Sequence, residues 1–277
     1  MPLGYRLGLP AWAFSGWQDT YFPRGQAALA SYASVFNAVE GNTTFYRVPT
    51  AARVDSWREA LAGRDFEICF KLPRTVTHER TPQLDDLRAF LRAVERLETH
   101  LGPLLLQFPA TVDAAAINAM TALFEALPAG WRYVVEVRHA EFFAAPERLT
   151  PLLDRLGAGR VSLDARALYE GNTLHPEVVR ALHEKPDVPV LDAVWHGLAF
   201  TRLVLHPDGR NEAYLQRWAH RVAAQRQAGI DSYVMIHCPN NQHCPAFARH
   251  FHEALAAQYP DAGTLPGWPV PQQASLL

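Results

Sequence analysis

The chain has 277 residues, of which 49% are hydrophobic, so it can bury the core of one large α/β domain or two small ones. A formal net charge of -2 excludes a global field that draws the protein to nucleic acid or an anionic membrane, while a local basic cleft stays open. Three cysteines do not make a disulfide framework, and the first ten residues lack the apolar core of a secretory signal. No uncharged apolar run reaches the ~18 residues of a membrane span. We therefore expect a cytoplasmic protein with no membrane partner.

Short β-rich runs alternate with amphipathic helical segments along the chain. Their starts recur roughly every 30 residues, the size of a strand-crossover-strand unit. The strand-like runs are 5–9, 37–40, 66–71, 104–108, 133–138, 160–164, 200–204 and 233–237. The main helical segments are 51–62, which Thr50 can cap, 85–100, 113–127, 211–228 and 245–258. This alternation predicts a (β/α)8 TIM-barrel-like α/β fold with parallel strands, with an open doubly wound sheet as the alternative.

No domain linker interrupts this pattern, so residues 1–277 are predicted to form one domain. The segment 168–195 is irregular and rich in His and Pro, and it can hold a short helix at 176–185 on the barrel rim. Residues from about 260 to 277 are predicted to be an extended Pro-rich tail that Trp268 attaches to the surface.

Polar and aromatic side chains follow the predicted strands. In a barrel of this kind, functional groups lie at the carboxyl ends of the strands, so these side chains are expected to converge on one face. In chain order they are Trp12, Glu40, Asn42, Lys71, Thr77, His78, Gln107, Glu136, Arg138, His139, Asp164, Arg202, His206, His237 and Asn240.

Three of these positions have more than one interpretation. Lys71 ends the run EICFK and could act as a base, a Schiff-base nucleophile or an anion anchor, or could reach past the rim into water or pair with a glutamate. Glu136 and Arg138 share one face of their strand and could be a structural ion pair or part of a catalytic site. Glu40 with Glu136 could form an acid/base pair, and Asp164 could equally brace a loop or cap a helix.

The run HCPNNQHC at 237–244 has two Cys and two His, but its spacing is not that of a common zinc knuckle. The chain lacks a GxxxxGKS loop, a GxGxxG turn, a GxSxG elbow and an HExxH helix. Three cations, Lys71, Arg138 and Arg202, would stand in the same predicted site, where they oppose a bare divalent metal and favour a phosphate or carboxylate. We expect no metal and no cofactor.

Several segments together resemble the YecE-like family, which is domain-of-unknown-function family seventy-two. They are FNAVEGNTTFYRVP, FEICFKLPRTVTHER, LGPLLLQFP, VVEVRH, LAFTRLVLHPDGRNEAYLQRW and MIHCPNNQHCPAFARHFHEAL, and they span about residues 4–259. The resemblance implies a TIM-barrel-like fold and no established activity. The family is likened in fold to sugar isomerases and endonuclease IV, which is an analogy of fold alone.

The family's motif positions carry over to particular residues of this chain. They are Glu40, Asn42, Thr44, Tyr46, Lys71, Thr77, His78, Gln107, Glu136, Arg138, His139, Asn240 and Asn241. The chain departs from the family at GLPAWAFSGW, where many relatives have a Gly-Thr-Ser-Gly-Trp opening, and at RLVLHPD, so Arg202 carries over less directly than Lys71.

The first function hypothesis is an enzyme acting on an anionic small molecule, a phosphorylated sugar or a nucleotide. The candidate catalytic residues are Glu40, Lys71, Glu136 and His78. Glu40 or Glu136 would be the general base and His78 or His237 the proton donor. The candidate substrate-binding residues are Trp12, Asn42, Tyr46, Gln107, Arg138, Asp164, Arg202, His237 and Asn240.

Two other classes stay open. A nucleic-acid-binding or phosphodiester-processing protein would need a continuous basic groove, which the slightly acidic composition disfavours. A non-enzymatic ligand-binding barrel would use the same polar strand ends as structural ion pairs. The substrate, the reaction, the oligomeric state and even whether the chain is an enzyme are not determined by the sequence.

Overall fold

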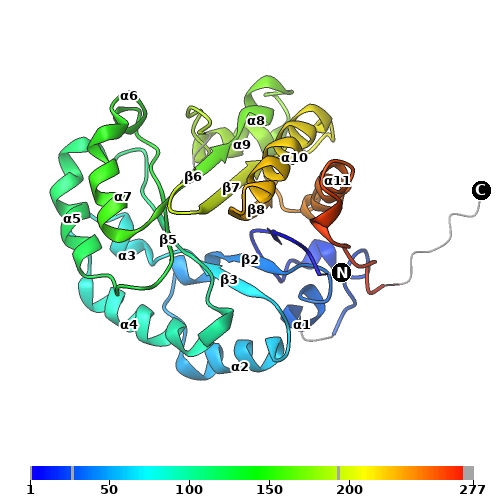
Figure 1. The fold of residues 1–277 in the computed structure, drawn as a ribbon, viewed down its shortest axis with the longest axis horizontal. Coiled ribbons are helices and arrows are strands. Elements are labelled where there is room, and N and C mark those ends of the chain that lie inside the picture. Colours follow the sequence, from blue (N-terminus) through cyan, green and yellow to red (C-terminus); the bar gives the residue numbers. More distant parts are fainter. Residues whose placement is uncertain (1, 26–27, 192–193, 271–277) are drawn as a thin grey trace, which may run out of the picture.

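The computed structural model describes residues 2–25, 28–191 and 194–270. Eight strands form the centre, and helices surround them (Figure 1). The strands are β1 (Arg6–Gly8), β2 (Ala38–Gly41), β3 (Glu67–Phe70), β4 (Leu104–Gln107), β5 (Tyr133–Glu136), β6 (Gly159–Asp164), β7 (Leu198–Val204) and β8 (Asp231–His237). Each falls on a predicted run, with ends shifted by one or two residues.

All paired strands are parallel. Six form a curled sheet in the order β1-β8-β7-β6-β5-β4, and β2 pairs with β3 in a second sheet. Hydrogen bonds join the two sheets at both seams: the Glu40 amide donates to the Leu9 carbonyl at 3.0 Å, and the Leu72 amide donates to the Leu105 carbonyl at 3.0 Å. The predicted TIM-barrel-like α/β fold is therefore confirmed.

The interior of the barrel begins with a layer of small and apolar side chains. This layer consists of Ala38, Cys69, Leu105, Val134, Val161, Leu198, Phe200, Tyr233 and Met235. Since strand side chains alternate between two faces, the residue two positions later points inward again. The next inward positions include Glu40, Lys71, Gln107, Glu136, Arg202 and His237. The alternation thus places a polar layer directly above an apolar one, at the carboxyl ends of the strands.

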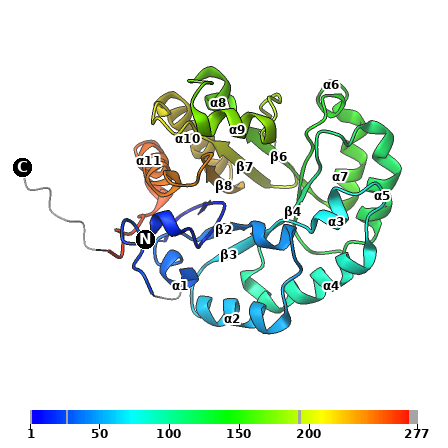
Figure 2. The same cartoon turned by 180° about the vertical axis from the view of Figure 1, so that it is seen from behind.

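The helices form the outer layer, seen from both sides in Figures 1 and 2. They are α1 (Ala28–Tyr32), α2 (Ala51–Leu61), α3 (Arg74–Thr77), α4 (Leu84–Val94), α5 (Ile117–Glu125), α6 (Glu141–Ala144), α7 (Thr150–Leu156), α8 (Arg166–Glu170), α9 (Pro176–Glu184), α10 (Glu212–Gln227) and α11 (Cys244–Ala256). Thr50 caps α2 as predicted, because its side-chain oxygen accepts a bond from the Arg53 amide at 3.3 Å. The predicted helix 85–100 is wrong in its second half, since α4 gives way to a 3-10 turn in which Glu98 has a φ of 56°.

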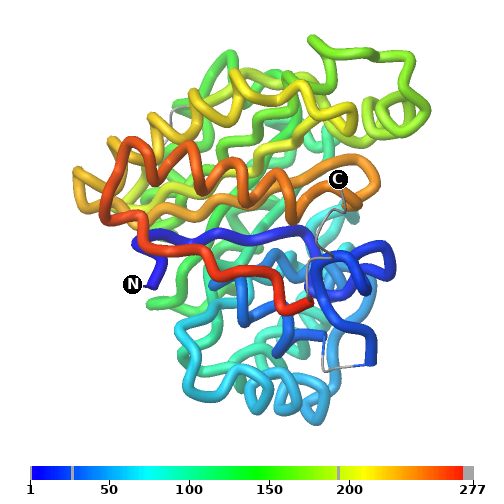
Figure 3. The backbone as a smooth tube through the Cα atoms, turned by 90° about the vertical axis from the view of Figure 1, so that its right-hand side faces the viewer, coloured from blue at the N-terminus to red at the C-terminus, as the bar shows by residue number. Residues whose placement is uncertain are grey.

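The segment between β6 and β7 carries α8 and α9. In the side view of Figure 3 it projects on the side opposite the N-terminus, which is the side of the carboxyl ends of the strands. The expected rim helix is therefore present as α9. Trp268 packs on the rings of Tyr21 and Phe22 and under the guanidinium of Arg249, which attaches the tail as expected. Residues 260–262 form a 3-10 turn rather than extended chain, and 271–277 lie outside the described residues.

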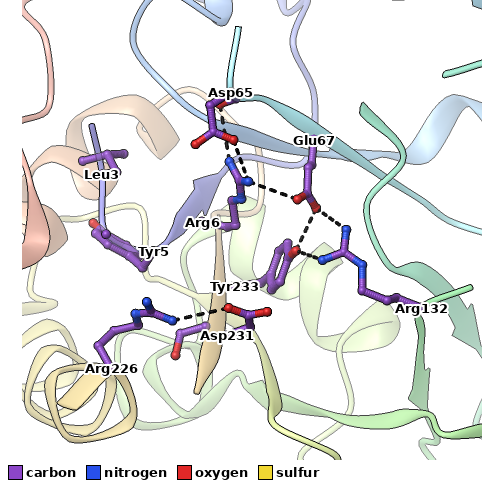
Figure 4. Close-up of a pocket in the computed structure, with 11 residues that line it drawn as sticks. Leu3, Tyr5, Arg6, Asp65, Glu67, Arg132, Arg226, Asp231 and Tyr233 are labelled. Carbon is purple, nitrogen blue, oxygen red and sulfur yellow. Dashed lines mark hydrogen bonds and ion pairs between the residues drawn. The ribbon is translucent and has the colours of Figure 1, made fainter. Parts of the chain in front are cut away.

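The amino-terminal end of the barrel is closed by a second polar cluster (Figure 4). Glu67 binds Arg6 at 3.1 Å and Arg132 at 2.8 Å, and the Tyr233 hydroxyl donates to it at 2.7 Å. Arg6 also pairs with Asp65 at 2.7 Å. Each of these charged groups has a partner, and polar contacts at this end of a TIM barrel serve stability. The functional site is therefore expected at the carboxyl ends of the strands.

Candidate active site

A buried arginine lies between two buried glutamates at the carboxyl ends of β2, β5 and β7. Arg202 makes two bonds to Glu40, from Nε and Nη2, both at 2.9 Å, and one from Nη1 to Glu136 at 2.5 Å. Their exposed fractions are 3%, 0% and 1%. Three strands far apart in the sequence thus meet in one network of ion pairs.

Further polar groups surround this network. The Arg138 Nε donates to Glu136 at 2.6 Å, and its Nη1 donates to the Glu184 carbonyl at the end of α9 at 2.8 Å. On the other side, the Asn42 amide donates to Glu40 at 2.9 Å, and His237 Nε2 lies 3.2 Å from the same carboxylate. Both carboxylates are therefore fully engaged by fixed donors.

These contacts keep both carboxylates charged. Burial alone would raise the pKa of Glu40, but the charge of Arg202 and its hydrogen bonds hold that pKa well below the usual range. For Glu136, burial is likewise outweighed by Arg202 and Arg138, which lower its pKa to about 2. A carboxylate in this state is a weak base, because protonating it breaks a buried ion pair.

Lys71 occupies the end of β3 and faces the same network. Its Nζ lies 3.5 Å from the centroid of the Phe45 ring, and within the described residues it has no hydrogen bond or ion pair. Burial and the charge of Arg202 lower its pKa to about 7. Lys71 is thus an amine that gains and loses a proton near neutral pH.

A second lysine approaches the network from the rim. Lys185 follows α9 directly after Glu184, whose carbonyl binds Arg138. Burial, with the charges of Arg202 and Arg138, lowers the pKa of Lys185 to about 8. In the part of the chain that is described, its amine also lacks a hydrogen-bond or ion-pair partner. We call the set Glu40, Lys71, Glu136, Arg138, Lys185 and Arg202 the barrel mouth.

Two histidines adjoin the barrel mouth and are neutral at pH 7. Burial lowers the pKa of His237 to about 4, although Glu40 opposes the shift. Burial and the nearby Lys71 charge lower that of His78 to about 4 as well. The His78 ring packs edge-on against Phe45 at 4.8 Å between ring centres, so Phe45 contacts both His78 and Lys71.

A cavity of about 630 Å³ opens beside Glu40. Trp12 meets Trp57 edge-to-face at 5.4 Å in its wall, and Tyr46 stands at its edge with 83% of its surface exposed. Its lining residues include Trp12, Glu40, Asn42, Tyr46, Arg47, Arg53 and Trp57. The cavity is large enough for a small organic molecule, with aromatic surface on one side and polar groups on another.

The sequence pattern of DUF72, described as a protein of unknown function, matches residues 6–273. The chain therefore belongs to the DUF72 family. It is also 34% identical over 278 residues to the UPF0759 protein YecE of Escherichia coli K12, covering 98% of this chain and 99% of YecE. The resemblance read from the sequence motifs is confirmed.

Solved structures of the family share the fold. A DUF72 protein of Enterococcus faecalis V583 aligns with a TM-score of 0.72 at 16% identity, covering 98% of this chain and 100% of that one. A DUF72 protein of Thermotoga maritima MSB8 aligns with a TM-score of 0.68 at 20% identity, covering 91% and 98%. At these identities the likeness concerns the fold alone.

Some residues predicted for the site of this DUF72 chain lie outside the network. Both oxygens of Asp164 are engaged, by Arg166 at 2.6 and 2.9 Å and by the Trp218 indole at 2.7 Å, which fits the alternative of a loop brace. The Asn240 amide donates to Glu177 of α9 at 2.5 Å. Gln107 is buried at the end of β4, in register with Glu136.

Other family motif residues have local roles. The Thr44 hydroxyl donates to the Lys71 carbonyl at 2.7 Å and so ties the loop after β2 to β3. Thr77 lies 2.9 Å from the His78 ring nitrogen. His206 contacts Asp208 at 2.7 Å and lies at a separate hollow of about 210 Å³. These residues shape the neighbourhood of the barrel mouth without entering the ion-pair network.

Neither a metal cluster nor a membrane span emerges from the described ranges. No group of three or more His, Cys, Asp or Glu residues there could hold a metal ion. In the run 237–244, Cys238 lies 3.4 Å from the Asn240 side-chain oxygen, and Cys244 begins α11. None of the helices described combines the length and apolar character that crossing a bilayer needs.

Lys185 and Phe45 are site residues that the strand-end rule missed. Lys185 follows a helix, and Phe45 sits in the 3-10 turn after β2, so neither stands at a strand end. One sequence signal was available for Lys185: the chain has only two lysines, and the other is Lys71.

Proposed function

We propose that this DUF72 protein is an enzyme that binds an anionic small molecule, such as a phosphorylated sugar or a nucleotide, at the barrel mouth. The observation that carries the proposal is the excess of positively charged side chains over carboxylates at the barrel mouth. Four cationic side chains face two carboxylates, and the two lysine amines have no ion-pair partner among the described residues.

The two kinds of cation have different parts in this arrangement. Arg202 and Arg138 are already bound to Glu40 and Glu136, so each carboxylate neutralises one guanidinium. Lys71 and Lys185 supply the excess positive charge when protonated. A phosphate or carboxylate that enters would compensate this excess through charge-assisted hydrogen bonds.

The adjoining cavity supports a ligand with a flat ring. Trp12 and Tyr46 offer aromatic surface on which a base or the apolar face of a sugar can stack. Asn42 lies between that cavity and the ion-pair network, since it lines the cavity and binds Glu40. A ligand ring in the cavity would lie beside Glu40 and Asn42, which border the ion-pair network at the barrel mouth.

Among the ionisable groups of the barrel mouth, Lys71 is the one best suited to react near neutral pH. The pKa of Glu40 is held well below its usual range and that of Glu136 near 2, so neither accepts a proton easily. Lys71 has its pKa lowered to about 7, the range in which an amine can lose its proton and act as a base or a nucleophile. Neutral His78 and His237 remain as hydrogen-bonding groups beside the reacting centre.

The test is ligand binding measured by calorimetry and thermal shift with inorganic phosphate, ribose 5-phosphate and adenosine monophosphate. A charge-assisted hydrogen bond contributes about 1.5–3 kcal/mol, so Lys185→Met should weaken phosphate-ester binding about 10- to 150-fold. Arg92→Ala is the control, because Arg92 is an exposed residue of α4 and its replacement removes one positive charge away from the barrel mouth. If none of these anions binds the native protein, or if the control loses as much affinity, the proposal fails.

Turnover separates an enzyme from a binding barrel. A bound phosphate ester should be converted by the native protein, and Lys71→Met should remove conversion more than binding. Tight binding with no conversion of any ligand that binds would favour the non-enzymatic barrel.

We also propose that the protein works in a reducing compartment such as the cytoplasm. Its cysteines, Cys69, Cys238 and Cys244, are all buried free thiols. Thiol titration of the freshly purified, unfolded protein should find three reactive groups, and a disulfide between Cys238 and Cys244 would count against this proposal.

A further inference from the structure

The use of lysine in this chain is unusually selective. The sequence has 26 lysines and arginines, of which two are lysines, leaving 24 arginines. Arginine supplies the positive charge of the described surface ion pairs, such as Arg58 with Glu98 and Arg155 with Glu125. Both lysines, by contrast, lie at the barrel mouth: Lys71 has its Nζ on the Phe45 ring, and Lys185 directly follows Glu184, whose carbonyl accepts a bond from Arg138.

An amine differs from a guanidinium in one chemical property that matters here. A guanidinium stays protonated in proteins and is not a nucleophile, whereas an ammonium can lose its proton and then attack a carbon. The described surface ion pairs of this chain use arginine, and the two amines stand at the barrel mouth, where a neutral nitrogen is available for chemistry.

The surroundings of Lys71 favour the neutral form. The side chain is buried and no carboxylate of the described residues lies within ion-pair distance of Nζ, and these two features outweigh the attraction of the Phe45 face, 3.5 Å from Nζ, for the charged form. Glu40 and Glu136 are ion-paired with Arg202, so their charges offset that of the Lys71 amine only in part. The positive charge of Arg202 repels the protonated form of Lys71 and so lowers its pKa.

The two lysines differ in their position. Lys71 ends β3 and its Nζ lies on the Phe45 face beside the ion-pair network, whereas Lys185 follows α9 at the rim, directly after the residue whose carbonyl binds Arg138. Burial lowers the pKa of both amines towards neutral pH. The inner amine is thus placed to react and the outer one to bind an anion.

We propose that Lys71 is a nucleophile that forms an imine with an aldehyde or ketone carrying a phosphate or carboxylate, and that Lys185 binds that anionic group. The inference rests on the anion-binding function proposed above and names the substrate class of the same site. It goes beyond that function, because anion binding by itself requires no carbonyl group.

The step balances without an added oxidant or reductant. The lone pair of neutral Nζ forms a bond to the carbonyl carbon, the π electrons move to the carbonyl oxygen, and one Nζ proton passes to that oxygen to give the carbinolamine. The carbinolamine then breaks its C–O bond, the nitrogen lone pair forms the C=N bond, and the leaving hydroxide takes the second Nζ proton and departs as water. Addition of water reverses the sequence and frees the amine.

Reductive trapping tests the imine directly. The native protein is incubated with dihydroxyacetone phosphate, pyruvate or glyceraldehyde 3-phosphate and reduced with sodium borohydride, and the adduct is located by peptide mass mapping. Only three amines can react, namely Lys71, Lys185 and the N-terminus. We expect at least 10-fold more adduct on Lys71 than on Lys185, and no preference for Lys71 in the urea-unfolded protein.

Variants separate the two roles. Lys71→Arg keeps a positive charge but no amine, so the adduct at residue 71 should be abolished. Lys71→Met removes both the amine and the charge and should abolish the adduct as well. Lys185→Met should lower trapping of dihydroxyacetone phosphate on Lys71 about 10-fold more than it lowers trapping of uncharged dihydroxyacetone. Circular dichroism and thermal unfolding check that each variant is folded.

The outcomes distinguish this inference from the function on which it rests. Glycerol 3-phosphate has the anion but no carbonyl group. If it binds in a Lys185-dependent way while no carbonyl compound of the panel labels Lys71, the imine is refuted and anion binding stands. If glycerol 3-phosphate does not bind and nothing labels Lys71 selectively, both proposals are overturned.

Discussion

Replacing Arg202 by methionine should destabilise the protein strongly at neutral pH. Methionine fills similar space but leaves Glu40 and Glu136 buried without the three bonds that Arg202 donates. Removing one partner of a buried ion pair costs about 3–5 kcal/mol. Glu136 keeps Arg138, and Glu40 keeps Asn42, so we expect a loss within this range rather than twice as large.

The loss should depend on pH in a defined direction. In the native protein both carboxyl pKa values are lowered, so the stability that they contribute is full above about pH 4.3 and disappears as the pH falls through the folded values. In Arg202→Met, burial without a guanidinium partner raises the pKa of Glu40, while Arg138 still holds that of Glu136 down. The variant then takes up protons on folding, so lowering the pH from 7.5 to 4.5 reduces the loss of unfolding free energy that the substitution causes.

The assay is urea unfolding of both proteins at pH 7.5, 6.0 and 4.5. The difference in unfolding free energy should shrink to about 1–2 kcal/mol at pH 4.5, as protonation removes the unpaired charge. A triple variant that adds Glu40→Gln and Glu136→Gln should recover most of the loss at pH 7.5. A variant as stable as the native protein at pH 7.5, or a difference that does not change with pH, would refute the reasoning.

Two further predictions concern single side chains. Lys71→Met should stabilise the protein at pH 6, by up to about 4 kcal/mol, because the lowered pKa of Lys71 means that its charged form is disfavoured by folding. The gain should decline as the pH rises from 7 towards 10.4, and urea unfolding that finds no gain at pH 6 contradicts this account. Asp164→Asn should cost about 1–3 kcal/mol, since the bonds to Arg166 and Trp218 lose their charged acceptor, while phosphate-ester affinity stays unchanged. A fall in phosphate-ester affinity measured by calorimetry would show that Asp164 contributes to ligand binding and would contradict this prediction.

Strand positions were predictable because each strand leaves a strong local signal. The run EICFK is apolar and rich in residues that favour strands, and β3 lies within it. The second half of the predicted helix 85–100 failed, since Glu98 takes a left-handed backbone conformation that no apolar spacing reveals. Local patterns record which face of an element is buried, and they do not record where a single residue turns the chain.

The convergence of the strand-end side chains on one face was predictable, but Lys185, Phe45 and the pairing of the charges were not. The alternation of strand side chains, combined with the barrel rule, placed Glu40, Lys71, Glu136 and Arg202 on one face. It could not show that Arg202 would take both glutamates and leave Lys71 without a carboxylate. That choice depends on ångström distances between strands 66 and 162 residues apart in the chain.

By itself, the sequence determined the barrel, the family and the face on which the polar side chains gather, because hydrophobic alternation and strand spacing act over short stretches of chain. The tertiary structure decided which charges neutralise one another and which amines remain able to react. Those outcomes depend on burial and on distances between charges, and both exist only after the eight strands have closed around the same axis.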